Sequence, residues 1–284
     1  RDQDTLTNFV DPTSTMFKRF WDPLCAAVLN TDANEGSAKL IGQMLDMTLL
    51  KGPDFARPFL TPNGLSGTLV DPALAYLQQR KVHVALGARV KSIGLAENQA
   101  THLVIGNNTI EFSPTDHLIL CLPPHQVKSL LPQVQVPTST RPILNVHFGM
   151  NEEYRLPRNA AFIGVVNGIS QWIFRRETTL SVTVSNATAL MDKDVDELSD
   201  QIWQEVASAI GRPDISRPPY RLIKEKRATI CQTPEQIALR PDSLTRWKNL
   251  FLAGDWTNTG LPATIEGAVK SGQVAAKNLV NSFS

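Results

Sequence analysis

The sequence is poor in cysteine and contains no long apolar run. Its three cysteines, Cys25, Cys121 and Cys231, lie far apart in the 284 residues. They form neither a disulfide framework nor a zinc-binding pattern, and isolated thiols are typical of proteins in a reducing cytoplasm. No stretch approaches the roughly 20 apolar residues that a membrane-spanning helix needs. We therefore expect a cytoplasmic protein.

A strong charge of either sign is also lacking. The formal net charge is +1, and the sequence has no basic run and no aromatic ladder. It therefore predicts no nucleic-acid partner. The five histidines show neither HxxxH nor HExxH spacing, so no metal site is expected. The hydrophobic content of 42% and the charged content of 19% are ordinary for a folded protein.

The most informative segment, residues 247–280, predicts a strand, an acid, a turn and a helix in that order. Residues 249–253 form an apolar run of the length of a buried strand. Gly254 and Asp255 end this run, so a carboxylate lies at the carboxyl end of the strand, where open α/β sheets bind ligands. Pro262 suits the first turn of a helix, and small or apolar residues recur at helical spacing from Thr264 onward.

This unit suits a flavin. The Asp255 carboxylate can accept hydrogen bonds from sugar or ribitol hydroxyl groups. The N–H groups at residues 263–265, in particular those of Thr264 and Ile265, give the helix N-terminus a partial positive charge. Such a helix end stabilises the negative charge of a reduced flavin ring. The alternative is an ordinary crossover from strand to helix.

Several motifs carry a family resemblance. The segment FLAGDW…GLPATIEGAVKSGQVAA resembles the C-terminal FAD motif of the amine oxidase and phytoene desaturase superfamily. The form DWTNTGLPATIEGA, with Trp256 in it, most resembles bacterial hydroxysqualene dehydroxylases, also described as squalene-associated FAD-dependent desaturases. The FWDPL and LNT motifs at residues 20–24 and 29–31 are similar to stretches of the same enzymes. The resemblance implies FAD as cofactor, with Gly254, Asp255, Trp256, Thr264 and Ile265 among the residues that bind it.

Three further landmarks of this superfamily follow in the expected order. Residues 59–66 lie where these enzymes have a Pro/Gly-Leu turn, and residues 118–124 resemble a strand that ends in proline beside the cofactor. Residues 87–93 resemble a strand whose valine, here Val90, meets the adenine through its backbone. The family's glycine-rich fingerprint GxGxxG is not found in the sequence. We therefore expect a fragment that lacks the N-terminal nucleotide-binding unit.

The resemblance implies an α/β fold with two interleaved domains. One is an incomplete Rossmann-like FAD-binding domain, and the other is an α+β substrate domain of antiparallel sheet plus helices. The expected division assigns residues 1–76 and 141–215 to the substrate domain and residues 77–140 and 216–284 to the FAD-binding domain.

The implied activity is an FAD-dependent oxidation or reduction of a C30 isoprenoid, in first place the reductive dehydroxylation of hydroxysqualene to squalene in squalene and hopanoid biosynthesis. Such a substrate implies peripheral contact with the cytoplasmic membrane, and an electron donor, which the sequence does not identify, must reduce the FAD. No residue is assigned as the catalytic acid. A carotenoid desaturase, a flavin amine oxidase and a flavin-free lipid-binding or scaffold protein remain open.

Local patterns also predict individual elements. An apolar stripe over residues 16–28 indicates an internal helix, with membrane contact as the alternative. Asp71 and Pro72 indicate the start of a helix over residues 71–80, and Asn107-Asn108 indicates a hairpin turn. Further helices are expected at residues 38–50 and 192–210. Further strands are expected at residues 82–86, 88–95, 101–105, 109–112, 117–121, 143–148, 161–166, 171–175, 179–185 and 220–230.

Overall fold

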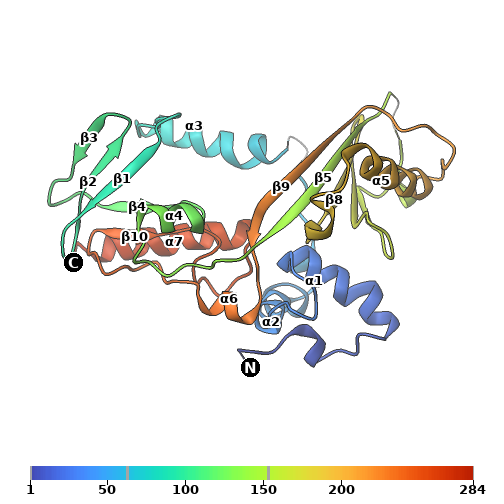
Figure 1. Cartoon of the computed structure of the whole chain (residues 1–284), viewed down its shortest axis with the longest axis horizontal. Helices are drawn as coiled ribbons and strands as arrows, with labels where there is room; N and C mark the ends of the chain where they lie inside the picture. Colours follow the sequence, from blue (N-terminus) through green and yellow to red (C-terminus); the bar gives the residue numbers. More distant parts are fainter. Residues whose placement is uncertain (1, 62–63, 152–153, 284) are drawn as a thin grey trace.

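The computed structural model describes residues 2–61, 64–151 and 154–283 and has a mixed α/β architecture. Figure 1 shows an elongated molecule with one part that contains α5 and another part that contains α7, and the long strands β5 and β9 run between them. The fold class expected from the sequence is confirmed. The helices are α1 (Asp22–Leu29), α2 (Ala38–Met47), α3 (Asp71–Gln79), α4 (Pro124–Leu130), α5 (Val195–Ala209), α6 (Pro234–Ala238) and α7 (Ile265–Asn281). The strands are β1 (Val90–Leu95), β2 (Ala100–Ile105), β3 (Asn108–Glu111), β4 (Leu118–Leu120), β5 (Thr140–Gly149), β6 (Phe162–Gly164), β7 (Trp172–Arg176), β8 (Thr179–Val184), β9 (Tyr220–Ile230) and β10 (Leu250–Leu252).

The largest sheet is antiparallel and has the strand order β6-β7-β8-β5-β9. Leu144, Val146 and Phe148 alternate along β5 and are fully buried, because successive side chains of a strand point to opposite faces. They pack against the apolar stripe of α5, which includes Ile202 and Trp203. This sheet and its helix form the largest core of the molecule.

A second sheet and a parallel strand pair lie in the other part. Strands β1, β2 and β3 form an antiparallel meander, and β4 pairs in parallel with β10. The loop between β2 and β3 consists of Gly106 and Asn107, one residue earlier than the sequence indicates. Gly106 has φ of 61°, which the first position of this type of tight hairpin turn requires and which glycine adopts without strain.

Two Asp-Pro pairs begin α-helices that directly continue a preceding π-helical turn. The π-helical turns Phe17–Trp21 and Ser66–Val70 directly precede α1 and α3. In each turn the aspartate N–H bonds five residues back, from Asp22 to Phe17 and from Asp71 to Ser66. A wider turn accommodates a proline that has no N–H to donate. The helix predicted over residues 71–80 is confirmed as α3, but Asp71 is not its N-cap, because the backbone is already helical from Leu65 onward.

The LNT motif joins the N-terminal helices to the large sheet. Asn30 ends α1 with φ of 50°, a left-handed conformation that asparagine tolerates. Its Nδ2 donates to the Arg141 carbonyl at 3.2 Å and to Thr229 Oγ1 at 2.9 Å. Its Oδ1 accepts the Asn186 N–H at 2.6 Å. One buried side chain thus contacts β5, β9 and the segment after β8.

Two other expectations need comment. Residues 82–86 are exposed and pair with no strand of the described residues, so the prediction of a strand here is wrong. Pro62 and Asn63 of the predicted Pro/Gly-Leu turn lie outside the described residues. Strand β9 pairs with β5, although the expected division places residues 216–284 in the FAD-binding domain. The division into domains stays a prediction.

Candidate functional site

The predicted order of strand, acid, turn and helix is present at β10 and α7. Gly254 follows β10 with φ of 136°, and its N–H donates to Ser271 Oγ on α7 at 2.8 Å. The loop then runs to Thr264, whose Oγ1 caps α7 by accepting the Gly267 N–H at 3.3 Å. An added Cβ at Gly254 would lie 2.5 Å from Trp256 Nε1, so glycine is required by both conformation and space.

A groove of about 360 Å³ opens beside this loop, at the carboxyl ends of β4 and β10. We call it the central groove. Parallel strands bring their carboxyl ends to one edge of a sheet, where ligands bind in open α/β folds. Helix α7 contributes Ala268, Ser271 and Gly272, a thin face on which an added Cβ at Gly272 would meet no atom within 4 Å. The other lining residues are Cys121, Leu122, Pro123, Pro124, His125, Thr140, Arg227, Ala228, Thr229, Ile230, Ala253, Gly254, Asp255 and Trp256.

The structure brings three of the six predicted binding residues together in the central groove, namely Gly254, Asp255 and Trp256. Val90 lies in a separate hollow of about 570 Å³ on β1, which we call the side hollow. Leu122 lines both, so the two spaces are neighbours. Thr264 and Ile265 lie at the start of α7 and line neither space.

The start of α7 offers fewer free amides than the sequence suggests. The Ala263 N–H donates to the buried Oε1 of Gln232 at 2.8 Å, so it is not available to a ligand. The amides of Thr264 and Ile265 have no acceptor within the described part of the chain. These two therefore keep the anion-attracting character of a helix N-terminus.

Asp255 is a partly buried ionisable group of the central groove. Burial raises the pKa of its carboxyl, while the nearby Arg240 cation and the N–H groups of Trp256 and Asp255 lower it. A carboxylate that has lost water is stabilised by any ligand that supplies hydroxyl donors. Its role in binding a cofactor stays a prediction.

Trp256 is buried, with 2% of its surface exposed. Its Nε1 donates to the Leu122 carbonyl at 2.8 Å, and its ring packs in the core under β4 and β10. This contact joins the loop after β10 to the end of β4. The structure thus gives Trp256 an anchoring role, and direct contact with a cofactor stays a prediction.

Two buried polar residues that organise the groove were missed in the sequence. Arg240 bonds the carbonyls of the loop after β10, as described below. Gln232 Nε2 donates to the Leu29 carbonyl at 2.8 Å, and its own N–H donates to Thr31 Oγ1 at 3.1 Å. Together with its bond to Ala263, Gln232 joins the LNT motif to the start of α7. Neither Arg240 nor Gln232 is part of a local sequence pattern, because the groups that each of them binds lie well away from it in the sequence.

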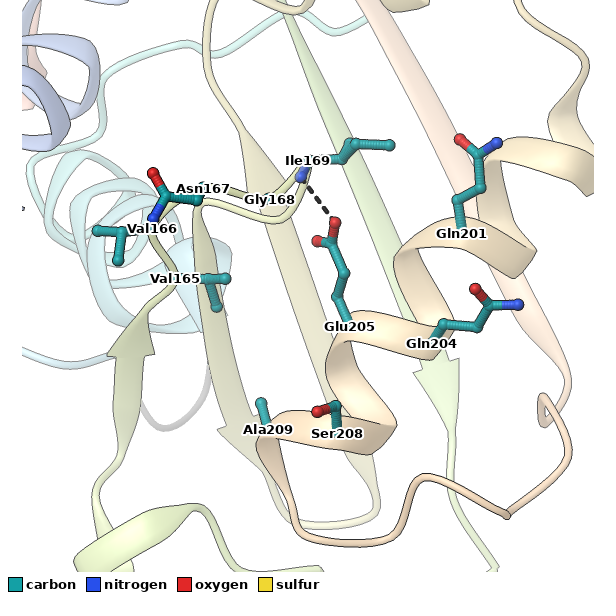
Figure 2. Close-up of a pocket in the computed structure, with 10 residues that line it drawn as sticks. All are labelled: Val165, Val166, Asn167, Gly168, Ile169, Gln201, Gln204, Glu205, Ser208 and Ala209. Carbon is teal, nitrogen blue, oxygen red and sulfur yellow. Dashed lines mark hydrogen bonds between the residues drawn. The ribbon is translucent and has the colours of Figure 1, made fainter. Parts of the chain in front are cut away.

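Another hollow, of about 640 Å³, lies between the 165–169 turn and α5. Figure 2 shows the Glu205 side chain reaching from α5 to the amide of Ile169. Its two oxygens accept the N–H groups of Ile169 at 2.8 Å and Ser170 at 2.7 Å. An added Cβ at Gly168 would lie 2.8 Å from Glu205 Oε2. This carboxylate is satisfied by the turn it holds, so the hollow is a structural feature rather than a reactive site.

Solved structures identify the fold of the chain. An oxidoreductase from Methanosarcina mazei matches with a TM-score of 0.70 at 11% identity, covering 96% of this chain and 68% of that chain. Cyclohexylamine oxidase from Brevibacterium oxydans matches with a TM-score of 0.67 at 13% identity, covering 100% of this chain and 69% of that chain. The chain thus shares the fold of these two proteins, and its central groove lies where open α/β sheets bind ligands.

Sequence comparison then gives the family. The model of the flavin containing amine oxidoreductase family matches residues 2–280, and the chain belongs to this family. The flavin cofactor expected from the sequence is confirmed at the level of the family.

The relatives in this family agree with the resemblance seen in the sequence. Hydroxysqualene dehydroxylase of Rhodopseudomonas palustris is 40% identical over 268 residues, covering 94% of this chain and 63% of that protein. The same enzyme of Sinorhizobium fredii is 41% identical over 270 residues, covering 95% and 64%. The 15-cis-phytoene desaturase of Narcissus pseudonarcissus is more distant, at 22% over 250 residues, covering 75% and 41%. The chain therefore spans slightly less than two thirds of the length of the hydroxysqualene dehydroxylases it matches.

Proposed function

We propose that the protein is an FAD-dependent oxidoreductase that converts hydroxysqualene reductively to squalene and water. The observation that carries this proposal is the identity of 40–41% to hydroxysqualene dehydroxylases over 94–95% of this chain. The more distant match to a phytoene desaturase supports an isoprenoid substrate in general and makes carotenoid desaturation the second choice.

The central groove fits a flavin nucleotide. It offers the largely buried Asp255 carboxylate for hydroxyl donors, and it leaves open space over Gly272 on α7. The free amides of Thr264 and Ile265 suit a negatively charged edge of a ring. The side hollow at Val90 borders the groove through Leu122, which suits a ligand with two linked halves.

The chemistry divides between the cofactor and the chain. When bound, a reduced flavin supplies hydride to the carbon that loses its oxygen, and the departing hydroxyl takes a proton and leaves as water. The α7 N-terminus stabilises negative charge beside the groove, and Asp255 orients hydroxyl groups in it. An electron donor must reduce the flavin again for the next turnover.

The face of the large sheet opposite α5 would provide an apolar wall for such a substrate. Phe162, Trp172 and Phe174 lie together on this face, with ring centroids 5.9 Å apart for Phe162–Trp172 and 5.6 Å apart for Phe162–Phe174. All three are partly exposed. Aromatic surface of this kind suits a hydrocarbon chain better than a polar ligand.

The substrate supports the further proposal of peripheral contact with the cytoplasmic membrane, because a C30 hydrocarbon is dissolved in a bilayer. The 16–28 stripe does not provide an obvious contact surface. Phe17 is 8% exposed and packs with Trp21 and Val28 around the N-terminal core, whereas Met16 is 57% exposed. Within the described residues, no helix combines the length and apolarity needed to cross a membrane.

Turnover with defined substrates tests the proposed function. In its full-length form, the protein should convert hydroxysqualene to squalene with reduced FAD and leave phytoene and amines unchanged. Asp255→Ala should lower FAD occupancy, whereas the exposed Asp214→Ala should not. Turnover of phytoene or an amine in place of hydroxysqualene would overturn the substrate, and unchanged FAD occupancy in Asp255→Ala would overturn the role of Asp255.

A further inference from the structure

Arg240 is a buried cation beneath the loop that follows β10. Only 7% of its surface is exposed, and all three guanidinium nitrogens donate to this loop. Its Nη2 donates to the Asp255 carbonyl and its Nη1 to the Leu261 carbonyl, both at 2.8 Å. Its Nε donates to the Thr257 carbonyl at 2.9 Å. The side chain therefore holds the loop at its beginning, its middle and its end.

The charge of Arg240 is not neutralised by direct contact with an acid. No carboxylate of the described residues forms an ion pair with it within 4.0 Å. Burial lowers the pKa of its guanidinium to about 10, and Asp255 raises it, so the group stays protonated at neutral pH. Backbone carbonyl dipoles satisfy its donors but leave its net charge in a poorly solvated region.

The carbonyl groups that Arg240 binds lie in the two parts of the candidate cofactor site. Asp255 begins the loop, and Leu261 ends it directly before the first turn of α7. We infer that Arg240 is the positioning residue of this site: it sets the Asp255 carboxylate relative to the α7 N-terminus and adds a positive charge beneath both. A lysine could keep the charge, but its single ammonium group cannot reproduce a planar fork that reaches three carbonyls.

The second half of this inference rests on the proposed function. A buried cation beside a ring that gains negative charge on reduction stabilises the reduced form. Arg240 therefore makes the reduction potential of a bound flavin more positive. Its effect on the loop needs no cofactor, so the two halves can be tested separately.

The experiment compares Arg240→Lys, Arg240→Met and the exposed control Arg155→Met. Hydrogen exchange of residues 253–265 is measured first without cofactor. Both Arg240 variants should exchange about tenfold faster or more, since each loses hydrogen bonds to a charged group, and the control should match the wild type. FAD is then added as the probe, and its dissociation constant and reduction potential are measured. Both Arg240 variants should bind FAD more weakly, but only Arg240→Met should shift the potential to more negative values.

Each outcome separates one claim from the others. Unchanged exchange of residues 253–265 in a folded Arg240→Met protein would overturn the positioning role. An unchanged potential in that variant would overturn the electrostatic role. If Arg240→Met does not fold, Arg240→Lys still tests the geometry, because it keeps the buried charge. A wild-type protein that binds no FAD, combined with faster exchange in both variants, would remove the proposed function and leave the positioning role intact.

Discussion

The large sheet with α5 and the central groove are stabilised in different ways. All adjacent strands of the sheet pair in antiparallel fashion, and one continuous core joins the sheet to α5. The groove rests on two strands of three residues each, β4 and β10, and on a loop that contains the positive φ angles of Gly254 and Gly260. Gln232 and Arg240 hold that loop from outside, and the loop's own Trp256 holds it to the Leu122 carbonyl.

The comparison shows how a stable scaffold can carry a site that is built from loops. Apolar burial stabilises the sheet wherever its pattern of alternating residues is kept. The groove depends instead on individual polar contacts between segments that lie far apart in the chain. Loops positioned in this way by a rigid scaffold commonly carry function. We therefore expect mutations in the sheet to act by changing side-chain volume, and mutations in the groove to act by changing backbone geometry and charge.

The largest effect is expected in the core of the sheet. Trp203→Ala removes a ring that packs against Phe148 at a centroid distance of 4.9 Å and whose Nε1 donates to the Ile215 carbonyl at 3.0 Å. The free energy of unfolding should fall by about 3–5 kcal/mol, as for other buried aromatic residues. Urea denaturation followed by circular dichroism measures this loss. The control is Trp172→Ala on the opposite, partly exposed face, and an equal loss there would contradict the assigned core.

The next effect is expected at the loop of the groove. Gly254→Ala forces a Cβ into a backbone with φ of 136° and against the Trp256 indole. We expect a loss of about 2–4 kcal/mol in the free energy of unfolding, from strain and overpacking together. Gly42→Ala in α2 is the matched control, since its Cβ would meet no atom within 4 Å. That variant should be neutral or more stable by about 1 kcal/mol. Equal effects at the two glycines would contradict the claim that the backbone and the space at residue 254 require glycine.

A smaller effect is expected at the junction between the N-terminal helices and the sheet. Asn30→Ala loses three hydrogen bonds and puts alanine at φ of 50°, at a cost of about 2 kcal/mol. Asn30→Gly keeps the left-handed backbone and should recover about half of that loss. Thermal unfolding of both variants separates conformation from hydrogen bonding. Identical melting temperatures for the two would show that backbone conformation contributes nothing here.

The smallest effect is a dependence of stability on pH through Asp255. Its pKa is raised in the folded chain, mainly by burial, so ionisation above that pKa destabilises the cofactor-free fold. The stabilising protonated form is fully present below the unfolded pKa of about 4, and its contribution is lost as the pH rises through the folded pKa. Asp255→Asn should therefore be more stable than the wild type at neutral pH, and this advantage should shrink toward pH 4. Denaturation of both proteins across this range checks the sign, and an advantage that grows on acidification would contradict it.

The sequence predicted those parts of the site whose signals are local. The apolar run of β10, the acid at its end and the start of α7 lie in one continuous stretch from Leu250 to Thr264, so one pattern contains them all. The roles of Arg240 and Gln232 could not be predicted in this way, because Gln232 contacts Leu29 and Ala263 while standing far from both in sequence.

Two local patterns predicted less than the backbone shows. Residues 82–86 have the composition of a strand, but they pair with no strand of the described residues, so this prediction is wrong. Asp71-Pro72 begins α3 as predicted, but a π-helical turn directly before it makes the helix longer than the pattern indicates. Strand pairing and a π-helical turn both depend on backbone hydrogen bonds, which composition does not specify.

The central claim is that the groove beside Asp255 belongs to a flavin site, and the visible absorption spectrum tests it most directly. The protein should be purified in its full-length form. We predict the spectrum of a bound oxidised flavin, which is weakened in Asp255→Ala and retained in Asp214→Ala. A well-folded, colourless protein that cannot take up added FAD would contradict the account.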